Sequence, residues 1–359
     1  MTTPPTSSPV RIGVLAPLSR PGWVQAGEHL LAGLELAAAE VNAAGGVQLD
    51  LVVRDTAADA QKAEAAVDEL AGLGVTALVG EYHSVVARAV AARADALSVP
   101  YLCSSAVLDA LIDQPSEWVA RIAPAQSRGW RLYADFLLGA GHRQVAVATQ
   151  PSVYWASGTR ILREHLAAGG GTLVELDLNT LDAAAVCDTL AGSQATALLM
   201  LSGIPDPAVP VVKAVRADPR LTGLLIGAPA GQPEFAEWLA ALGVDGAGIP
   251  FLRYLPEQLT PLGTRVDPAL RSRLGGAPSF VAFEGYDTIT VLADVLRTHG
   301  ADRARIAAAW PHVSVEGTRG VISFTRVPGI NVWQWAWPPI QVVERDPQTL
   351  DHFRVLHSG

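Results

Sequence analysis

Repeated alternation of short apolar strands and amphipathic helices is the feature that most constrains the fold. In the first third of the chain, four segments have the apolar or alternating pattern of strands: 11–16, 49–54, 75–80 and 100–103. Three segments with helical periodicity separate them: 27–42, 60–73 and 84–98. Successive β-α-β units predict a parallel sheet with helices on both faces.

The same alternation of strands and helices begins again after Arg121. The predicted strands of this second half are 144–149, 172–177, 196–201 and 223–227. The predicted helices are 126–139, 157–168, 182–190, 208–216 and 280–299. The tail, 321–343, has strand patterns interrupted by prolines. The fold class is therefore α/β, with two doubly wound parallel-sheet lobes.

Length and charge agree with this interpretation. A chain of 359 residues with 50% hydrophobic content can bury two cores, and 17% charged residues is too few for a largely disordered chain. The formal net charge is -9. An acidic surface repels phosphate backbones, so the sequence argues against nucleic acid as a direct partner.

The first ten residues, Met1–Val10, are polar and rich in Pro, Ser and Thr, without the basic and apolar segments of a secretory signal. No apolar run approaches the ~18 residues of a membrane helix. We therefore expect no membrane insertion. The chain as written is expected to be cytoplasmic, or periplasmic or extracellular if a signal segment has been removed.

Motifs of enzymes and metal sites are missing from the sequence. Cys103 and Cys187 fit no metal-ligand spacing and are predicted to be buried free thiols, with a disulfide as the alternative. The eight histidines are scattered, and neither a nucleophile elbow nor a nucleotide-binding loop is present. We expect no catalysis, no metal and no cofactor.

Ligands of open α/β sheets bind beyond the carboxyl ends of the strands, and a cleft between two such sheets is the expected site. This rule predicts ligand contacts in five loops: 17–23, 81–84, 104–107, 150–155 and 228–232.

Six motifs in order along the chain carry a family resemblance. They are IGVLAPLSRPG (12–22), GLELAAAEVNAAGGV (33–47), VVRDTAADAQKA (52–63), LVGEYHS (78–84), FVAFEGYDTITVLADVL (280–296) and EGTRGVISF (316–324). Together they resemble type I periplasmic (solute) binding proteins of ABC transporters, in the group that binds branched-chain amino acids and amides. Residues 78–97 most resemble the cytoplasmic amide sensor of that group.

The resemblance implies two lobes joined by three crossovers, which close on a ligand by hinge motion. The implied amino-terminal lobe is 1–123 plus 251–325, and the implied carboxyl-terminal lobe is 124–250 plus 326–359.

The resemblance also implies binding roles for four residues. Ser84 matches a serine whose hydroxyl and backbone N–H hold the polar head of the ligand, and Tyr82 matches an aromatic residue beside it. Tyr154 matches the tyrosine that covers the ligand, and Ser105 falls where backbone groups face it. The alternatives are that Ser84 only caps the helix after it, and that the tyrosines belong to the core or rim.

Four further residues are candidates from their position in these loops: Trp23, Ser104, His83 and Val107. Trp23 either covers the ligand or covers the lobe edge, and Ser104 either lines the cleft or makes a turn. His83 either donates to the ligand or is an exposed loop histidine. In the tail, Trp333, Trp335 and Trp337 alternate on one side of a predicted strand, which favours packing over a ligand wall.

Two departures from amino-acid binders bear on the ligand. Those proteins have a threonine where this chain has Val107, and they pair the ligand ammonium with an acid of the second lobe. Here the corresponding loop, APAGQ (228–232), has no carboxylate before Glu234. Because burying an unpaired ammonium is costly, the sequence favours a neutral or anionic small polar ligand, such as an amide or a urea-like or amino-acid-derived molecule.

Two functions remain open from the sequence. One is a solute-binding protein that delivers its ligand to an ABC permease. The other is a cytoplasmic amide-sensor-like regulator that acts through a protein partner.

Overall fold

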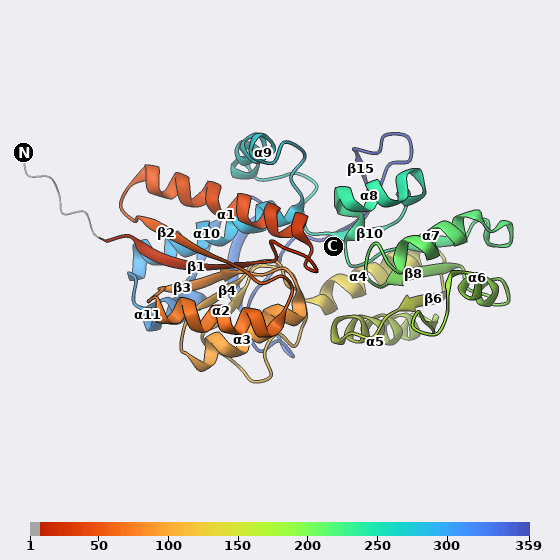
Figure 1. The fold of residues 1–359 in the computed structure, drawn as a ribbon, viewed down its shortest axis with the longest axis horizontal. Coiled ribbons are helices and arrows are strands. Elements are labelled where there is room, and N and C mark those ends of the chain that lie inside the picture. Colours follow the sequence, from red (N-terminus) through yellow and green to blue (C-terminus); the bar gives the residue numbers. More distant parts are fainter. Residues whose placement is uncertain (1–7) are drawn as a thin grey trace, which may run out of the picture. The chain divides into compact units, whose positions relative to one another are not determined.

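The computed structural model describes residues 8–359 and forms two compact units (Figure 1). Unit 1 comprises the described residues up to Ala125 together with Gln258–Pro339. Unit 2 comprises Gln126–Glu257 and Ile340–Gly359. The chain thus passes from one unit to the other three times, after Ala125, after Glu257 and after Pro339.

Unit 1 is built on one sheet in the order β11-β12-β13-β5-β4-β3-β1-β2. Its strands are β1 (Val10–Ala16), β2 (Leu49–Asp55), β3 (Ala77–Gly80), β4 (Tyr101–Cys103), β5 (Val119–Arg121), β11 (Ser314–Glu316), β12 (Val321–Thr325) and β13 (Trp333–Trp335). The pairs from β2 to β13 are parallel, whereas β12 pairs antiparallel with both β13 and β11.

The helices of unit 1 are α1 (Val24–Ala44), α2 (Ala60–Gly72), α3 (Ser84–Ala96), α9 (Pro261–Leu274), α10 (Phe280–His299) and α11 (Arg303–Ala309), followed by a 3₁₀ turn, η4 (Trp310–His312). In Figure 1, α1 and α10 lie together, and α2 lies beside α3. Glycine allows the contact between α1 and α10, because a Cβ on Gly33 would stand 1.9 Å from the Ala282 carbonyl oxygen.

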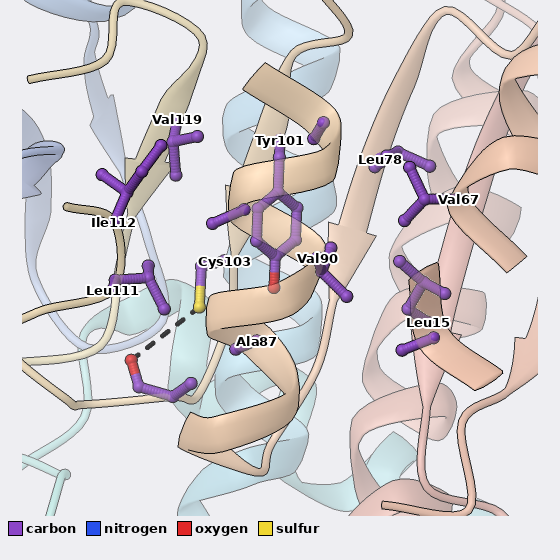
Figure 2. Packing of buried hydrophobic residues seen from close by; sticks show 14 of the residues in the cluster. Leu15, Val67, Leu78, Ala87, Val90, Tyr101, Cys103, Leu111, Ile112 and Val119 are labelled. Atoms are coloured by element: carbon purple, nitrogen blue, oxygen red, sulfur yellow. Dashed lines mark hydrogen bonds between the residues drawn. The ribbon is translucent and has the colours of Figure 1, made fainter. Parts of the chain in front are cut away.

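Side chains of β1 alternate between the two faces of the sheet, and one of these faces contributes to the core beneath α2 and α3. Leu15 belongs to this cluster, together with Leu78 of β3. Figure 2 shows the cluster near β4, where the side chains of Tyr101 and Cys103 and those of Ala87 and Val90 of α3 contribute to the same apolar interior. This packing fixes the strand ends from which the candidate loops leave.

Unit 2 contains a parallel sheet in the order β7-β6-β8-β9 and a separate antiparallel sheet in the order β10-β14-β15. The strands are β6 (Gln144–Thr149), β7 (Thr172–Asp177), β8 (Ala197–Leu201), β9 (Leu225–Gly227), β10 (Phe251–Arg253), β14 (Gln341–Arg345) and β15 (Phe353–Ser358). The helices are α4 (Gln126–Gly139), α5 (Val153–Ala168), α6 (Ala183–Ala191), α7 (Ala208–Ala217) and α8 (Ala236–Leu242), with 3₁₀ turns η1 (Pro219–Leu221), η2 (Gln232–Glu234) and η3 (Gly243–Gly246).

The α/β class with two doubly wound parallel sheets is confirmed, but the expected lobe boundaries differ from those of the units. Residues 326–339 lie in unit 1 rather than in the second lobe, because β13 pairs with β5. Residues 251–257 lie in unit 2 rather than in the first lobe, because β10 pairs with β14.

Two other expectations concern the described residues, and a third falls mainly outside them. Cys103 and Cys187 are buried free thiols, as predicted. None of the helices in residues 8–359 is both long enough and apolar enough to cross a bilayer. The expectation about Met1–Val10 depends mainly on residues outside the described part.

The tryptophan stripe does not form one packed face. Trp335 is buried, with the Arg319 guanidinium 5.0 Å from its ring centroid. Trp333 is half-buried under Arg326. Trp337 is 76% exposed, because β13 ends at Trp335 and the alternation of the strand does not extend to it. The packing interpretation is therefore wrong for Trp337.

Candidate ligand-binding site

Three neighbouring strands of unit 1 end at one edge of its sheet. β1 lies beside β3, and β3 lies beside β4, all in parallel. The loops that follow them carry Trp23, Tyr82–Ser84 and Ser104–Val107. Topology therefore places seven of the eight residues predicted from the sequence at the carboxyl edge where α/β folds bind ligands.

His83 joins the loop after β3 to the loop after β1. Its Nε2 accepts the backbone N–H of Trp23 at 3.0 Å, which places its ring proton on Nδ1. Burial lowers the pKa of His83 to about 4, so the ring is neutral near pH 7. His83 is half-buried rather than an exposed loop histidine, and Nε2 is not available to donate to a ligand.

Aromatic rings gather around this junction. The Tyr82 ring lies 6.5 Å from the Trp23 ring and 5.4 Å from the His83 ring, centroid to centroid, at steep interplanar angles. All three side chains are half-buried. Edge-to-face packing of this kind holds aromatic side chains in defined positions, and part of each surface stays exposed.

Asp55, the last residue of β2, orders the loop after β1. Its Oδ1 accepts the backbone N–H groups of Leu18 and Ala57, and its Oδ2 accepts from the hydroxyl of Ser19 and from Lys62 Nζ. Partial burial acts to raise the pKa of Asp55. The hydrogen bonds outweigh this effect of burial, and the bond from Ser19 contributes most among them. Together they hold the pKa of Asp55 well below its usual range.

Glu81 is a fully buried carboxyl group that sequence analysis did not single out. It follows β3 directly, at a left-handed φ of 65° that side chains rarely adopt. Its Oε1 accepts the backbone N–H groups of Tyr82 and His83, both at 2.9 Å. Burial raises the pKa of Glu81 to about 7, although these two hydrogen bonds act to lower it. Glu81 thus sets the backbone course into the candidate site.

The Ser84 hydroxyl links the loop after β3 to the loop after β4. Its oxygen accepts the backbone N–H groups of Val107 and Leu108, both at 3.3 Å. Helix α3 begins at Ser84 with His83 at its N-cap, so the interpretation of Ser84 as the capping residue is wrong. Because its oxygen accepts both bonds, the Ser84 O–H hydrogen remains to be donated to another group.

The side chains of Ser104 and Ser105, which follow β4, contact different residues of α10. The Ser104 hydroxyl lies 2.8 Å from the Thr288 hydroxyl of α10 and is fully buried, which favours a packing role. Ser105 lies beside Glu284. Burial raises the pKa of Glu284 to about 7, and Arg319 and then Ser105 oppose this effect. Arg319 is itself fully buried, 3.3 Å from the Glu284 carboxylate.

In unit 2, Tyr154 is positioned from two sides. Ser152 caps α5 by accepting the Tyr154 backbone N–H at 3.1 Å, and Gln126 Nε2 donates to the Tyr154 carbonyl oxygen at 3.0 Å. The Tyr154 ring lies edge-on to Trp130, at 5.8 Å between centroids, and 4.7 Å from Trp155. Burial raises the pKa of Tyr154, so the phenol is protonated near pH 7.

The first carboxylate after the 228–232 loop in the sequence is already paired. Glu234 Oε2 lies 2.9 Å from Arg253 Nε, and the Glu234 side chain is 1% exposed. Arg345 also donates to the carbonyl oxygens of Pro233 and Glu234. This acid therefore has a cationic partner within its own unit. Among residues 8–359, no group of three His, Cys, Asp or Glu side chains is arranged to hold a metal.

The structure thus brings Trp23, Tyr82, His83, Ser84 and Val107 into one hydrogen-bonded and aromatic network in unit 1, as described above. Ser105 lies at the same edge, Ser104 is directed at α10, and Tyr154 stands on the carboxyl edge of unit 2. Residues that organise this network, Glu81 and Asp55, were missed.

Two α/β units, each with polar and aromatic side chains at its carboxyl edge, define the class of two-unit ligand-binding proteins. A comparison with family models matches residues 9–332 to the family described as "Periplasmic binding protein". The chain belongs to the periplasmic binding protein family. Its fold is the type I periplasmic-binding fold, as the sequence resemblance implied.

Solved structures with similar folds include a leucine-binding protein, LivK, from Thermotoga maritima. It has a TM-score of 0.83 at 20% identity, over 96% of this chain and 97% of that one. LivJ from Streptococcus pneumoniae, in complex with isoleucine, has a TM-score of 0.82 at 18% identity, over 98% and 100%. An ABC transporter solute-binding protein from R. palustris, in complex with benzoate, has a TM-score of 0.80 at 18% identity, over 98% and 96%.

Among curated proteins, the "Leu/Ile/Val-binding protein homolog 8" of Brucella abortus is 33% identical over 132 residues. This match covers 36% of the present chain and 32% of the relative, so it spans about a third of either protein.

Proposed function

We propose that this protein is a non-enzymatic solute-binding protein, which binds a small polar ligand that is neutral or anionic, such as an amide, and delivers it to an ABC permease. The observation that carries the ligand class is the ion pair between Glu234 and Arg253.

The ion pair supports a ligand without a free ammonium. A buried ammonium needs a carboxylate partner, because desolvation of an unpaired charge costs several kcal/mol. Glu234 is the first acid after the 228–232 loop in the sequence, and its carboxylate is held by Arg253. In unit 1, Val107 also supplies no hydroxyl, and its backbone N–H is directed at Ser84.

Unit 1 supplies suitable groups for the polar head of such a ligand. The Ser84 O–H is oriented by two backbone donors, which leaves its hydrogen for a carbonyl or carboxylate oxygen. The half-buried rings of Trp23 and Tyr82 offer an apolar wall beside it. Relatives in the fold comparison were solved with leucine, isoleucine and benzoate. Delivery to a permease is supported by the similar folds of solute-binding proteins of ABC transporters from R. palustris and Sphaerobacter thermophilus.

A thermal-shift screen tests the ligand class. Purified protein is heated with short aliphatic amides, urea, leucine, valine, benzoate and small aliphatic carboxylates in turn. A ligand at 100 times its dissociation constant stabilises the fold by about 2.7 kcal/mol, which is a readily measured shift. We expect amides or carboxylates to raise the melting temperature and amino acids to leave it unchanged. Stabilisation by leucine or valine alone would contradict the proposed ligand class.

A further inference from the structure

Strand β7 stands at the end of the parallel sheet of unit 2, and its outer edge is open. The Thr172 N–H donates to the carbonyl oxygen of Arg143, just before β6. Because the backbone groups of successive strand residues point to alternate sides, those of Leu173 and Glu175 point away from β6. Within residues 8–359, no group forms a hydrogen bond with the N–H or C=O of these two residues.

The edge strand of the unit 1 sheet, β2, is protected by side chains where β7 is not. Asn42 accepts a hydrogen bond from the Leu49 N–H and donates one to the Leu49 carbonyl oxygen. The Arg54 guanidinium donates to the Val53 carbonyl oxygen. Proteins use such cover, and also prolines, lysines and bulges, to prevent edge strands from pairing with another chain. Strand β7 has no proline or lysine, and its register with β6 runs without a bulge.

Val174 adds an apolar side chain to this open edge. It is 49% exposed, although Ala146, its neighbour on β6, is fully buried. Leu173, on the opposite face of the strand, is half-buried. A β-branched side chain beside unpaired backbone groups is suited to pairing with a further strand. A second copy of the chain supplies a strand with the same unpaired groups.

One antiparallel register uses all the unpaired backbone groups. A two-fold axis through Val174 places Leu173 of each copy opposite Glu175 of the other, and each such pair exchanges two main-chain hydrogen bonds. An axis through Glu175 would set two carboxylates directly opposite each other, which is destabilising. An axis through Leu173 would place Glu175 opposite Gly171, whose N–H already donates to the Leu166 carbonyl oxygen. The register centred on Val174 is therefore the favoured one.

The charges at the two ends of β7 are complementary in this register. The carboxyl end exposes Asp177. At the amino end, the exposed Arg143 side chain donates to the Gly169 carbonyl oxygen in the turn that leads into β7. Antiparallel pairing brings the acidic end of each strand to the basic end of the other, which favours association. Glu175 is already paired with Arg163 of its own unit.

We propose that two copies of this chain associate through their β7 strands, which pair antiparallel about a two-fold axis at Val174 and join the two parallel sheets into one continuous sheet. Such an interface uses the same surface of both copies, as in most homodimers. It involves unit 2 alone and does not depend on which ligand the protein binds.

Sedimentation equilibrium of the full chain over a series of concentrations tests the association. We expect a reversible dimer. Val174→Lys sets two ammonium groups opposite each other at the axis and should raise the dissociation constant of the dimer at least tenfold. The matched control is Val321→Lys, at a 61% exposed valine of β12 in unit 1, which should dimerise as the wild type does. A wild type that stays monomeric throughout, or a Val174→Lys dimer of unchanged affinity, would overturn the inference.

Cysteine cross-linking tests the register, and it also covers the case in which Val174→Lys does not fold. Directly opposite residues of an antiparallel pair have Cβ atoms about 4.5–5.5 Å apart, close to the separation that a disulfide spans. Val174→Cys should therefore form a disulfide-linked dimer under mild oxidation, seen on a non-reducing gel. Cys103 and Cys187 are buried and are present in every variant.

The matched control for cross-linking is Thr172→Cys. Thr172 is exposed on the same face of β7, but in the proposed register it lies opposite Leu176 of the second copy and far from the other Thr172. We expect at least tenfold less cross-linked dimer from this variant than from Val174→Cys. Equal cross-linking of the two variants, or none with Val174→Cys, would show that β7 does not pair in this way.

Discussion

Glu81 holds a carboxyl group in the interior of unit 1, where ionisation is costly. Burial raises its pKa to about 7, from 4.5 in the unfolded chain. The folded protein therefore binds one more proton than the unfolded chain between these pH values. The stability contributed is complete below pH 4.5 and is lost as the pH rises through 7, and it amounts to roughly 3 kcal/mol.

Glu81→Gln should remove this dependence, because the amide keeps an oxygen for the N–H groups of Tyr82 and His83 and does not ionise. We expect the variant to become more stable relative to the wild type between pH 5 and pH 8, by roughly 2.5 kcal/mol, because only the wild type loses this contribution. Urea unfolding at both pH values measures it. His83 titrates in the opposite direction, but it is present in both proteins and cancels in the difference.

The control for this prediction is Glu64→Gln, at an exposed position of α2. The pH dependence of its unfolding should parallel that of the wild type. Parallel curves for Glu81→Gln as well would show that the buried carboxyl does not titrate differently in the folded state.

Which site residues could be predicted from the sequence depends on what each one contacts. Topology predicted the loops that carry Trp23, Tyr82 and Ser84, and the family resemblance singled out Tyr82 and Ser84 within their loop. The partner of His83 is the backbone of Trp23, sixty residues earlier in the chain, and no local pattern indicates it.

At the scale of elements, the packing of α1 against α10 depends on glycine at two points. A Cβ on Gly33 would lie 1.9 Å from the Ala282 carbonyl oxygen, and one on Gly285 would lie 2.3 Å from the Leu30 carbonyl oxygen. Backbone atoms cannot move aside as a flexible side chain can. The two helices therefore approach each other more closely than side chains at these positions would permit.

Gly33→Ala should force the helices apart and destabilise the protein by about 3 kcal/mol, at the upper end of the usual cost of overpacking. Thermal or urea unfolding measures the loss. Gly72→Ala is the matched control, since Gly72 is an exposed helical residue with no atom within 4 Å of its added Cβ. It should be neutral or stabilising by about 0.5–1 kcal/mol through helix propensity. Equal effects of the two substitutions would contradict the close helix contact.

Several periodic elements were predicted to the residue, whereas others, both long and short, were missed. The predicted bounds of α4, β6, β7 and α10 agree with the structure, because each has a clear period and a marked end. The strands β5 and β10 were missed, because neither shows a marked apolar run over its three residues, and the 14-residue helix α9 was missed because Pro268 interrupts its helical pattern. The pairings of these two strands with β13 and β14 decide to which unit the flanking chain belongs, so the predicted lobe boundaries were displaced with them.

At the scale of the whole molecule, the last segment of the chain completes unit 2. All five residues of β14 are buried, and β14 pairs with both β10 and β15. Arg345 also holds the carbonyl oxygens of Pro233 and Glu234. The carboxyl-terminal strands are therefore part of the structure that surrounds the 228–232 loop.

Deleting Ile340–Gly359 should unfold unit 2 selectively. Exposing several buried side chains costs about 1.5–3 kcal/mol each, which together rivals the 5–15 kcal/mol of a typical domain. Limited proteolysis with mass spectrometry should find new cleavage sites concentrated in Gln126–Glu257. The control, Val355→Ala, changes a 42% exposed residue of β15 and should give the wild-type digest. Unchanged protection of unit 2 after the deletion would contradict this assignment.

The three passages of the chain between the units also set an order of events during synthesis. The strands β6 to β9 emerge from the ribosome as one continuous stretch, so all strands of the parallel sheet of unit 2 are available before the rest of the chain has been synthesised. Helix α1 has to wait for α10, which begins more than two hundred residues after α1 ends. At about 5–20 residues per second, that wait lasts roughly 10 to 50 seconds. During this time the apolar face of α1 lacks its native partner, and a chaperone or transient non-native contacts have to shield it from water.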